Sequence, residues 1–143
     1  MATIRGFADV SVGDELPSQR MTVTREDLIR YAGASLDFNK IHWDEKTATE
    51  VGLPDVIAHG MLTMALAARV VTDWAGDPGA VVRYQTKFTR PVVVPNDGVG
   101  ATVEVSGRVI DKDEADHTVR VELAAVFDGR TVLGRPTAVV KLA

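Results

Sequence analysis

A chain of 143 residues, 45% hydrophobic and 25% charged, has the size and composition of a single globular domain with a core of its own. Its formal net charge of -4 argues against non-specific binding to nucleic acid, which basic proteins show. The sequence contains no cysteine, which excludes disulfides, thiolate metal ligands and a cysteine nucleophile.

The N-terminal segment, residues 1–17, has no basic flank leading into an apolar run, so we expect no signal peptide. The longest apolar stretch, residues 56–71, includes His59 and Arg69 and is too short to span a bilayer. Together with the absence of cysteine, these features predict a cytoplasmic protein without a membrane span.

Two short helices are predicted ahead of this apolar stretch. Thr24 precedes residues 25–35, and Asp27 gives the weak capping-box pattern of a helix start. Asp44 stands where it can cap a second helix over residues 45–51. The two helices flank one short loop.

A third helix is predicted over residues 58–74, and it is apolar on nearly every side. Its larger apolar set consists of Met61, Leu62, Met64, Ala65, Leu66, Ala67, Ala68, Val70 and Val71. A surface helix shows a single apolar stripe, so we expect this helix to be surrounded by other structure.

The second half of the chain reads as β-strands joined by short turns. The strand-like segments, rich in Val and Thr and partly alternating, are residues 80–88, 100–110, 117–127 and 131–142. Residues 111–116 and the pair Asp128–Gly129 supply turn signals between them. An antiparallel sheet with one wholly apolar helix predicts an α+β fold. This would be a single hot-dog domain, residues 1–143, whose sheet wraps around a long buried central helix.

The loop sequence LDFNKIHWD, residues 36–44, places an acid and an imidazole five positions apart, Asp37 and His42, with Asn39 between them. Both groups are suitable acid/base catalysts if the carboxyl is buried enough to hold a proton near neutral pH. His42 could remove a proton α to a thioester carbonyl, while Asp37 handles the proton on the β-oxygen.

The start of the long helix offers an electrostatic partner for such a pair. The sequence AHGM, residues 58–61, falls where the unpaired N–H groups and partial positive charge of a helix N-terminus are expected. Gly60 has no side chain, so a ligand oxygen could approach its backbone N–H, which could stabilise enolate-like charge. His59 precedes it and could cap the helix or contact a ligand.

Simpler structural roles remain open for the same residues. Asp37 could be a turn residue, Asn39 an Asx-turn residue that fixes the loop, and His42 a core histidine with its hydrogen bonds satisfied. No metal-ligand set is indicated, because His42 and His59 are 17 positions apart and no acidic residues cluster at ligand spacing. Ser35 lacks the glycine pattern of a nucleophile elbow, which argues against a serine hydrolase.

Residues 31–71, which contain this loop and helix start, resemble the hydratase-2 motif of the MaoC-like dehydratases. That motif has an aspartate, an asparagine, a histidine and an A-H-G helix start at spacings that fall here on Asp37, Asn39, His42 and Gly60. The stretches VTDWAGDPGAV, KFTRPVVVPNDG and GRPTAVVKLA resemble one branch of the family. That branch is the catalytic B subunit of the mycobacterial-type (3R)-hydroxyacyl-ACP dehydratase.

The resemblance implies a hot-dog enzyme that reversibly dehydrates (3R)-3-hydroxyacyl thioesters to trans-2-enoyl thioesters without a cofactor or metal. The setting it implies is type II fatty acid elongation of the mycolic acid type. It implies that Asp37 and His42 are catalytic and that Asn39, His59 and Gly60 are substrate-binding residues. The expected partners are an acyl-ACP or acyl-CoA substrate and a related hot-dog subunit in a heterodimer, or a second copy in a homodimer.

Other functions stay open from the sequence. An (R)-specific enoyl-CoA hydratase would share the chemistry and change the carrier. A non-catalytic acyl-binding hot-dog subunit would not need the pair of Asp37 and His42, so their presence argues against it. A hot-dog thioesterase would need a carboxylate on or near the buried helix, and residues 58–71 contain none.

Two positions depart from the family pattern. The common motif has glycine just before the aspartate and proline after the asparagine, where this chain has Leu36 and Lys40. We expect Leu36 to forbid backbone angles that only glycine tolerates. We expect Lys40 to be solvated rather than to contact Asp37 or a phosphate.

Overall fold

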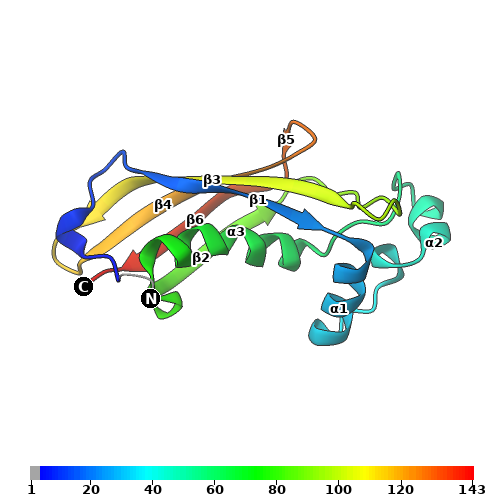
Figure 1. The fold of residues 1–143 in the computed structure, drawn as a ribbon, viewed down its shortest axis with the longest axis horizontal. Helices are drawn as coiled ribbons and strands as arrows, with labels where there is room; N and C mark the ends of the chain where they lie inside the picture. The colour runs from blue at the N-terminus through cyan, green and yellow to red at the C-terminus, as the bar shows by residue number, and fades with distance from the viewer. Residues whose placement is uncertain (1–3) are drawn as a thin grey trace.

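The computed structural model describes residues 4–143 as one antiparallel sheet with a long helix against one of its faces (Figure 1). In chain order the elements are η1 (Phe7–Asp9), β1 (Glu15–Val23), α1 (Arg25–Ser35), η2 (Lys40–His42), α2 (Glu45–Glu50), α3 (Gly60–Ala75), η3 (Pro78–Ala80), β2 (Val81–Phe88), β3 (Ala101–Asp113), β4 (Thr118–Phe127), β5 (Arg130–Thr131) and β6 (Leu133–Lys141). This is the α+β hot-dog arrangement that the sequence predicts.

The sheet has the strand order β1-β3-β4-β6-β2, with the short β5 paired to β4. Every pairing between these strands is antiparallel. The turn between β4 and β5 has positive φ at Asp128 (50°) and Gly129 (71°), the backbone that a two-residue hairpin prefers. The four predicted strand segments and this turn are therefore confirmed.

One strand, β1, has no counterpart in the sequence prediction. It forms an edge of the sheet beside β3, and its register shifts between Leu16 and Gln19, next to Pro17. An edge strand tolerates proline and irregular alternation because only one of its sides is paired. Those same features hide the strand in the sequence.

The helix starts follow the predicted caps. At α1, Thr24 Oγ1 accepts a hydrogen bond from the N–H of Asp27 (3.2 Å), and the Asp27 carboxylate accepts one from the N–H of Thr24 (2.8 Å). At α2, the Asp44 carboxylate accepts a hydrogen bond from the N–H of Lys46 (3.1 Å). The long helix α3 begins at Gly60 rather than at residue 58, with His59 as its N-cap.

The sheet and α3 share one apolar core. Strand β3 alternates exposed residues with buried valines, among them Val103, Val105 and Val109. The buried side of the helix consists of Thr63, Ala67, Val70, Val71, Trp74 and Ala75. Full burial of one such valine contributes roughly 1.5–3 kcal/mol, so this side fixes the helix to the sheet.

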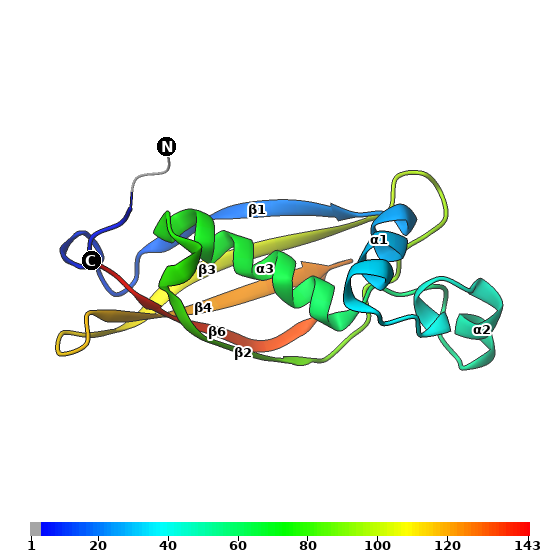
Figure 2. The ribbon, with the colours of Figure 1, turned by 90° about the horizontal axis from the view of Figure 1, so that it is seen from below.

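The opposite side of α3 is not surrounded, which differs from the prediction. Met61 is 56% exposed and Ala65 is also exposed, although both are apolar. Figure 2 looks onto this side and shows α3 lying across the sheet, with no other described element in front of most of its length. Residues 4–143 supply one sheet, which covers only one side of this largely apolar helix.

Helices α1 and α2 lie beyond the first turn of α3, at the opposite end of the molecule from the C-terminus (Figure 1, Figure 2). The loop between them therefore meets the start of α3, which is where the candidate site lies. No helix within residues 4–143 is long and apolar enough to cross a membrane.

Candidate active site

Short hydrogen bonds shape the loop after α1. Asp37 Oδ1 accepts a hydrogen bond from the N–H of Asn39 (3.2 Å), and Asn39 Oδ1 accepts one from the N–H of Ile41 (3.3 Å). These are Asx turns, and the second one caps η2. The turn roles considered for Asp37 and Asn39 therefore hold, and they deliver His42 to the first turn of α3.

Leu36 connects α1 to this loop in the left-handed conformation, with φ 62° and ψ 18°. The expectation that leucine forbids this backbone is therefore wrong. A single L-residue reaches this region at a cost of about 1–2 kcal/mol, and a helix end is the usual place for it. Leu36 thus adopts a backbone conformation that glycine reaches more easily.

Lys40, the second departure from the family pattern, is exposed and opens η2. Among residues 4–143 it has no acidic group within ion-pair distance, and Asp37 pairs with His42 instead. Lys40 therefore makes no ion pair with Asp37, and its expected lack of contact with a phosphate stays a prediction. The loop also shows that η2 forms without the proline that is common at this position.

His42 is buried, with 7% of its surface exposed. Its Nδ1 lies 2.7 Å from the carbonyl oxygen of Ile57. Because a carbonyl oxygen only accepts, Nδ1 carries the proton and Nε2 keeps its lone pair. Nε2 lies 3.9 Å from Oδ2 of Asp37, so the basic atom of the imidazole faces the carboxylate.

The separation of 3.9 Å between Nε2 and Oδ2 is too long for a direct hydrogen bond. It allows a ligand hydroxyl to contact both groups. The Asp37 side chain is 52% exposed. Residues 4–143 therefore leave this carboxyl open, so that a bound ligand or a second chain could cover it.

Gly60 is the first residue of α3, so its N–H has no partner within the helix and carries part of the positive end of the helix dipole. A Cβ added at Gly60 would lie 2.7 Å from a ring carbon of Phe88. The Phe88 ring, at the end of β2, therefore packs directly against the Gly60 backbone. This contact favours glycine independently of any ligand, and it is not evident from the sequence.

A cleft of about 340 Å³ extends from His42 and Gly60. The rest of its mostly apolar lining comes from Leu53, Ile57, Ala58, Thr63, Phe88, Thr89, Arg90, Pro91, Val92, Val132 and Leu133. An apolar cavity of this size with a few polar groups at one end is typical of small-ligand sites. Asp37, Asn39 and His59 are not among its lining residues.

His59 is 2% exposed, and its side chain makes no capping hydrogen bond to α3. The alternative that His59 caps the helix is confirmed for its position, since it is the N-cap residue of α3, although its side chain takes no part in the capping. Its Nε2 lies 3.1 Å from the carbonyl oxygen of Asp37, and its ring stacks on that of His42 with 3.8 Å between ring centroids. Burial is the main cause that lowers the pKa of His59 below its ordinary value.

Asp37, His42 and His59 each place a possible metal-ligand atom within 4.8 Å of the others, which the sequence spacing did not indicate. Hydrogen bonds engage one nitrogen of each ring. Nε2 of His59 faces the Asp37 carbonyl and Nδ1 of His42 faces the Ile57 carbonyl. The lone pairs that remain are on Nε2 of His42, on the Asp37 carboxylate and on Nδ1 of His59, which is buried and without a hydrogen-bond partner among residues 4–143.

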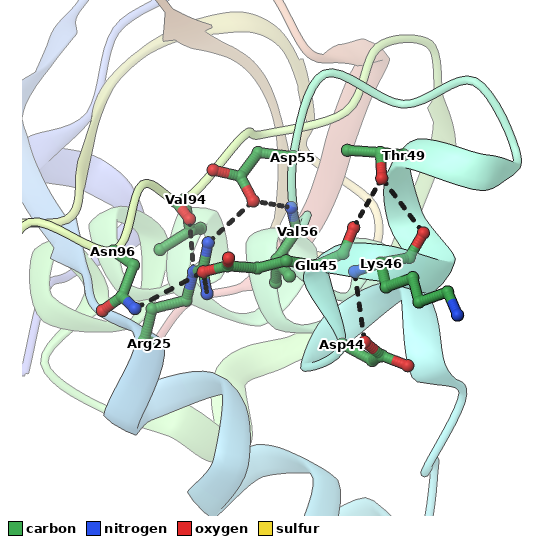
Figure 3. Close-up of polar contacts among 9 residues, drawn as sticks. All are labelled: Arg25, Asp44, Glu45, Lys46, Thr49, Asp55, Val56, Val94 and Asn96. Carbon is green, nitrogen blue, oxygen red and sulfur yellow. Dashed lines mark hydrogen bonds and ion pairs between the residues drawn. The ribbon is translucent and has the colours of Figure 1, made fainter.

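Arg25, which is not among the residues predicted for the site, joins the elements around this loop. Its guanidinium bonds Asp55 (2.8 Å) and Glu45 (3.0 Å), and its Nε donates to the carbonyl of Val94 (Figure 3). The start of α1, α2 and the segment after β2 are held together by this one side chain. A signal was present, because a cation in the first turn of a helix opposes the helix dipole and so indicates specific partners.

A family model described as the MaoC like domain matches residues 5–126 of the chain. The (R)-specific enoyl-CoA hydratase of Rhodospirillum rubrum is 36% identical over 107 residues, which cover 74% of this chain and 73% of that protein. The mitochondrial 3-hydroxyacyl-[acyl-carrier-protein] dehydratase of Arabidopsis thaliana is 30% identical over 115 residues, which cover 76% of this chain and 68% of that protein.

A solved structure described as a MaoC-like dehydratase superposes on this chain with a TM-score of 0.94 and 44% sequence identity. The superposition covers 98% of this chain and 43% of that chain. The fold is thus shared over nearly the whole chain, and the chain spans less than half the length of that protein.

Proposed function

Because this chain belongs to the family of MaoC-like dehydratases, which are hydro-lyases, we propose that it interconverts (3R)-3-hydroxyacyl and trans-2-enoyl thioesters by syn elimination of water. The observation that carries the proposal is the pair of His42 Nε2 and Asp37 Oδ2, 3.9 Å apart. An acid and a base this close suit removal of a proton and a hydroxyl from the same face of the acyl chain. His42 and Gly60 line the cleft that would hold the thioester.

Dehydration begins at C2 of the acyl chain. The lone pair on His42 Nε2 takes the C2 proton, and the electron pair of that bond moves toward the thioester carbonyl. The carbonyl oxygen gains negative charge and accepts a hydrogen bond from the Gly60 N–H. Removing a donor of this kind typically costs roughly 10²–10³ in rate.

The C3–O bond then breaks. The leaving hydroxyl takes the electron pair of that bond and a proton from the Asp37 carboxyl, and departs as water. His42 is left protonated and Asp37 ionised. Transfer of one proton from Nε2 to Oδ2 through a water molecule that contacts both then restores the two groups. The same steps in reverse give hydration. In both directions the N–H of Asn39 donates a hydrogen bond to Oδ1 of Asp37 and so orients the carboxyl group.

We propose an acyl carrier protein as the carrier, in fatty acid elongation. The similarity to the dehydratase of Arabidopsis thaliana supports this choice, and the mycolic acid setting rests on the sequence resemblance to one branch of the family. The second candidate, an enoyl-CoA hydratase, is supported by the similarity to the enzyme of Rhodospirillum rubrum. Both carriers present the same thioester to the cleft, so the chemistry above serves either one.

We also propose that a second hot-dog unit completes the site. A related but different chain is our first choice for this unit, and a second copy of this chain is the alternative. Two features of this chain support a partner: the apolar side of α3 is open at Met61, and the carboxyl of Asp37 is half exposed. The similar solved structure supports it as well, since this chain corresponds to 43% of that chain.

Thioester turnover tests the reaction. (3R)- and (3S)-3-hydroxyacyl thioesters of graded chain length, on acyl carrier protein and on CoA, should show turnover of the (3R) series by absorbance of the enoyl product. Asp37→Asn and His42→Ala should each lower kcat by roughly 10²–10⁴. The double variant should lose little more, because the two groups act as a unit.

Two matched substitutions remove a histidine or an aspartate outside the candidate site, and so control for effects that do not depend on the pair of Asp37 and His42. His117→Gln removes an exposed histidine that stacks on Phe7, and Asp44→Asn keeps an equally good cap for α2. Both should retain wild-type kcat. Wild-type turnover in Asp37→Asn or His42→Ala would contradict the assigned roles, and reaction of the (3S) series alone would contradict the stereochemistry.

A further inference from the structure

We propose that His59 is a positioning residue that holds both groups of the catalytic pair, Asp37 and His42, in their reactive arrangement, an inference that rests on the proposed function. One imidazole has two tasks. Its edge bonds the backbone at Asp37, and its face supports the ring of His42. His59 is 2% exposed and does not line the cleft, so it acts through its neighbours and not on the substrate.

The edge contact restrains Asp37. Nε2 of His59 lies 3.1 Å from the backbone carbonyl oxygen of Asp37, and because that oxygen only accepts, Nε2 carries the proton. The other hydrogen bonds of Asp37 are local: its N–H donates to Ser35 Oγ, and its Oδ1 accepts from the N–H of Asn39. His59 therefore ties this residue to the start of α3, where the rest of the site is built.

The face contact restrains His42. The two imidazole rings stack with 3.8 Å between centroids and 22° between planes. Tyr31 packs edge-on against His59 with 4.7 Å between centroids, so the supporting ring is itself held in place. Together with the bond from Nδ1 of His42 to the Ile57 carbonyl, the stack keeps Nε2 directed at Asp37.

The second ring nitrogen of His59, Nδ1, favours the neutral form of this imidazole. Nδ1 is buried and has no hydrogen-bond partner among residues 4–143, so a proton there would be a buried donor without an acceptor. Burial and, more weakly, the adjacent His42 lower the pKa of His59, while the bond to the Asp37 carbonyl and the charge of the Asp37 carboxylate raise it; burial is the largest of these effects. A neutral ring lets His42 accept the substrate proton without a second positive charge stacked against it.

Two substitutions separate the two tasks of His59. Phenylalanine keeps an aromatic face for the stack and has no N–H for the Asp37 carbonyl. Asparagine keeps an N–H donor and has no ring. If both tasks matter, neither substitution should preserve the arrangement of the pair.

Imidazole NMR of the wild-type chain tests the tautomer without any assay of activity. The chain has three histidines, so each signal can be assigned with single variants. Long-range ¹⁵N–¹H spectra near pH 7 should show His59 as the neutral Nε2–H form, and its titration midpoint should lie below the ordinary value for a histidine. Titration of His59 near its ordinary value of about 6.5, or an Nδ1–H form, would overturn the proposal.

The variants test positioning. His59→Phe and His59→Asn should each shift the imidazole signals of His42 and leave those of His117 unchanged. Each should lower kcat by roughly 10²-fold with KM changed by less than about threefold, since misplacement by about 1 Å has such effects. In the Asp37→Asn variant, His59→Phe should lower kcat far less than it does in the wild type, because no intact pair of Asp37 and His42 remains to be positioned.

Unchanged His42 signals with wild-type kcat in both variants would overturn the proposal. The proposal would also be overturned if His59→Phe lowered kcat by a further 10²-fold in the Asp37→Asn variant, since that result indicates a general structural role for His59. If the wild-type chain turns over no thioester, the proposed function fails alone, and the His42 signals still decide the positioning role. Should a variant not fold, the tautomer and titration of the wild-type His59 remain decisive.

Discussion

Leu36 occupies a backbone conformation that glycine adopts more easily. It sits in the left-handed region at the C-cap of α1, and its side chain is 76% exposed. Because so little of the side chain is buried, it gains little from apolar contacts. The cost of about 1–2 kcal/mol for a left-handed L-residue is therefore not offset locally.

We expect Leu36→Gly to raise the free energy of unfolding by about 1 kcal/mol, because glycine removes the clash of Cβ with the backbone. Leu36→Ala is the matched control, since it removes most of the same side chain and keeps Cβ. Urea denaturation of the three proteins measures the difference. Equal stability of the glycine and alanine variants would contradict the strain at this position.

The contact of Gly60 with Phe88 gives two separate reasons for glycine at the helix start. Gly60→Ala should lower kcat by roughly 10²–10³, as expected when an oxyanion donor is blocked, and should also lower the melting temperature by displacing the ring. Adding Phe88→Ala to that variant removes the ring clash. The double variant should therefore regain stability but not turnover.

Melting temperature and kcat of the two single variants and the double variant complete this comparison. Phe88→Ala alone reports what the ring itself contributes. Recovery of turnover in the double variant would show that ring displacement caused the loss. The Gly60 N–H would then not be the donor to the thioester oxygen.

At the residue scale, proximity could be predicted where two groups are close in the sequence. Asp37 and His42 are joined by a loop so short that their spacing alone predicts that they can meet. The contacts of His59 with both of them depend on where the start of α3 lies against that loop, which spacing does not determine. The rule applied to Leu36 failed because it ignored the tolerance of a helix end for the left-handed conformation.

At the scale of elements, a polar clamp at Arg25 holds the loop that carries the pair. The Arg25 side chain is 20% exposed, and its partners Glu45 and Asp55 lie in α2 and just before the buried Val56. Figure 3 shows these groups converging, with Asn96 also donating to Glu45. A partly buried cation with three acceptors restrains α1 and α2 relative to each other.

Arg25→Met should lower the free energy of unfolding by about 1–3 kcal/mol, because hydrogen bonds to charged groups are lost and Asp55 keeps an unpaired charge. Arg30→Met is the matched control, since Arg30 forms an exposed ion pair with Glu26 within α1. That change should cost about 0.5 kcal/mol or less. Urea denaturation of both variants measures these changes in the free energy of unfolding. Equal losses of stability in Arg25→Met and Arg30→Met would contradict the clamp.

Elements with a regular pattern were predictable, and those without one were not. The valine alternation of β3 predicts a strand, whereas β1 has a proline and a register shift and gives no period-two signal. The predicted bounds of α3, residues 58–74, differ from the observed ones by two residues at the start and one at the end. The prediction that other structure surrounds this helix was wrong. A sequence shows which sides of a helix are apolar and does not show how many of them the same chain covers.

The whole molecule leaves apolar surface and two strand edges uncovered. Strands β1 and β2 are the ends of the sheet order, and Val82 on β2 is 57% exposed. Met61 is open on the free side of α3, one residue after the Gly60 of the candidate site. Exposed edges and apolar faces favour pairing with another chain, because pairing satisfies the backbone and buries the apolar groups.

We therefore expect the chain to function as part of a pair of hot-dog units joined along β2. Light scattering coupled to size-exclusion chromatography should give a particle of about twice the chain mass of 15.4 kDa, either alone or after co-expression with a related hot-dog subunit. Val82→Lys should shift this particle toward monomer and lower kcat, because a charge on a strand edge opposes pairing.

Val12→Lys is the matched control for this edge, since Val12 is equally exposed but lies in a turn before β1, outside every strand. It should leave both mass and turnover unchanged. A monomer with full turnover would contradict the need for any partner, because Asp37 would then work while half exposed. A fully active homodimer would contradict only the different chain as partner, since a second copy would then supply the cover that Met61 and Asp37 lack.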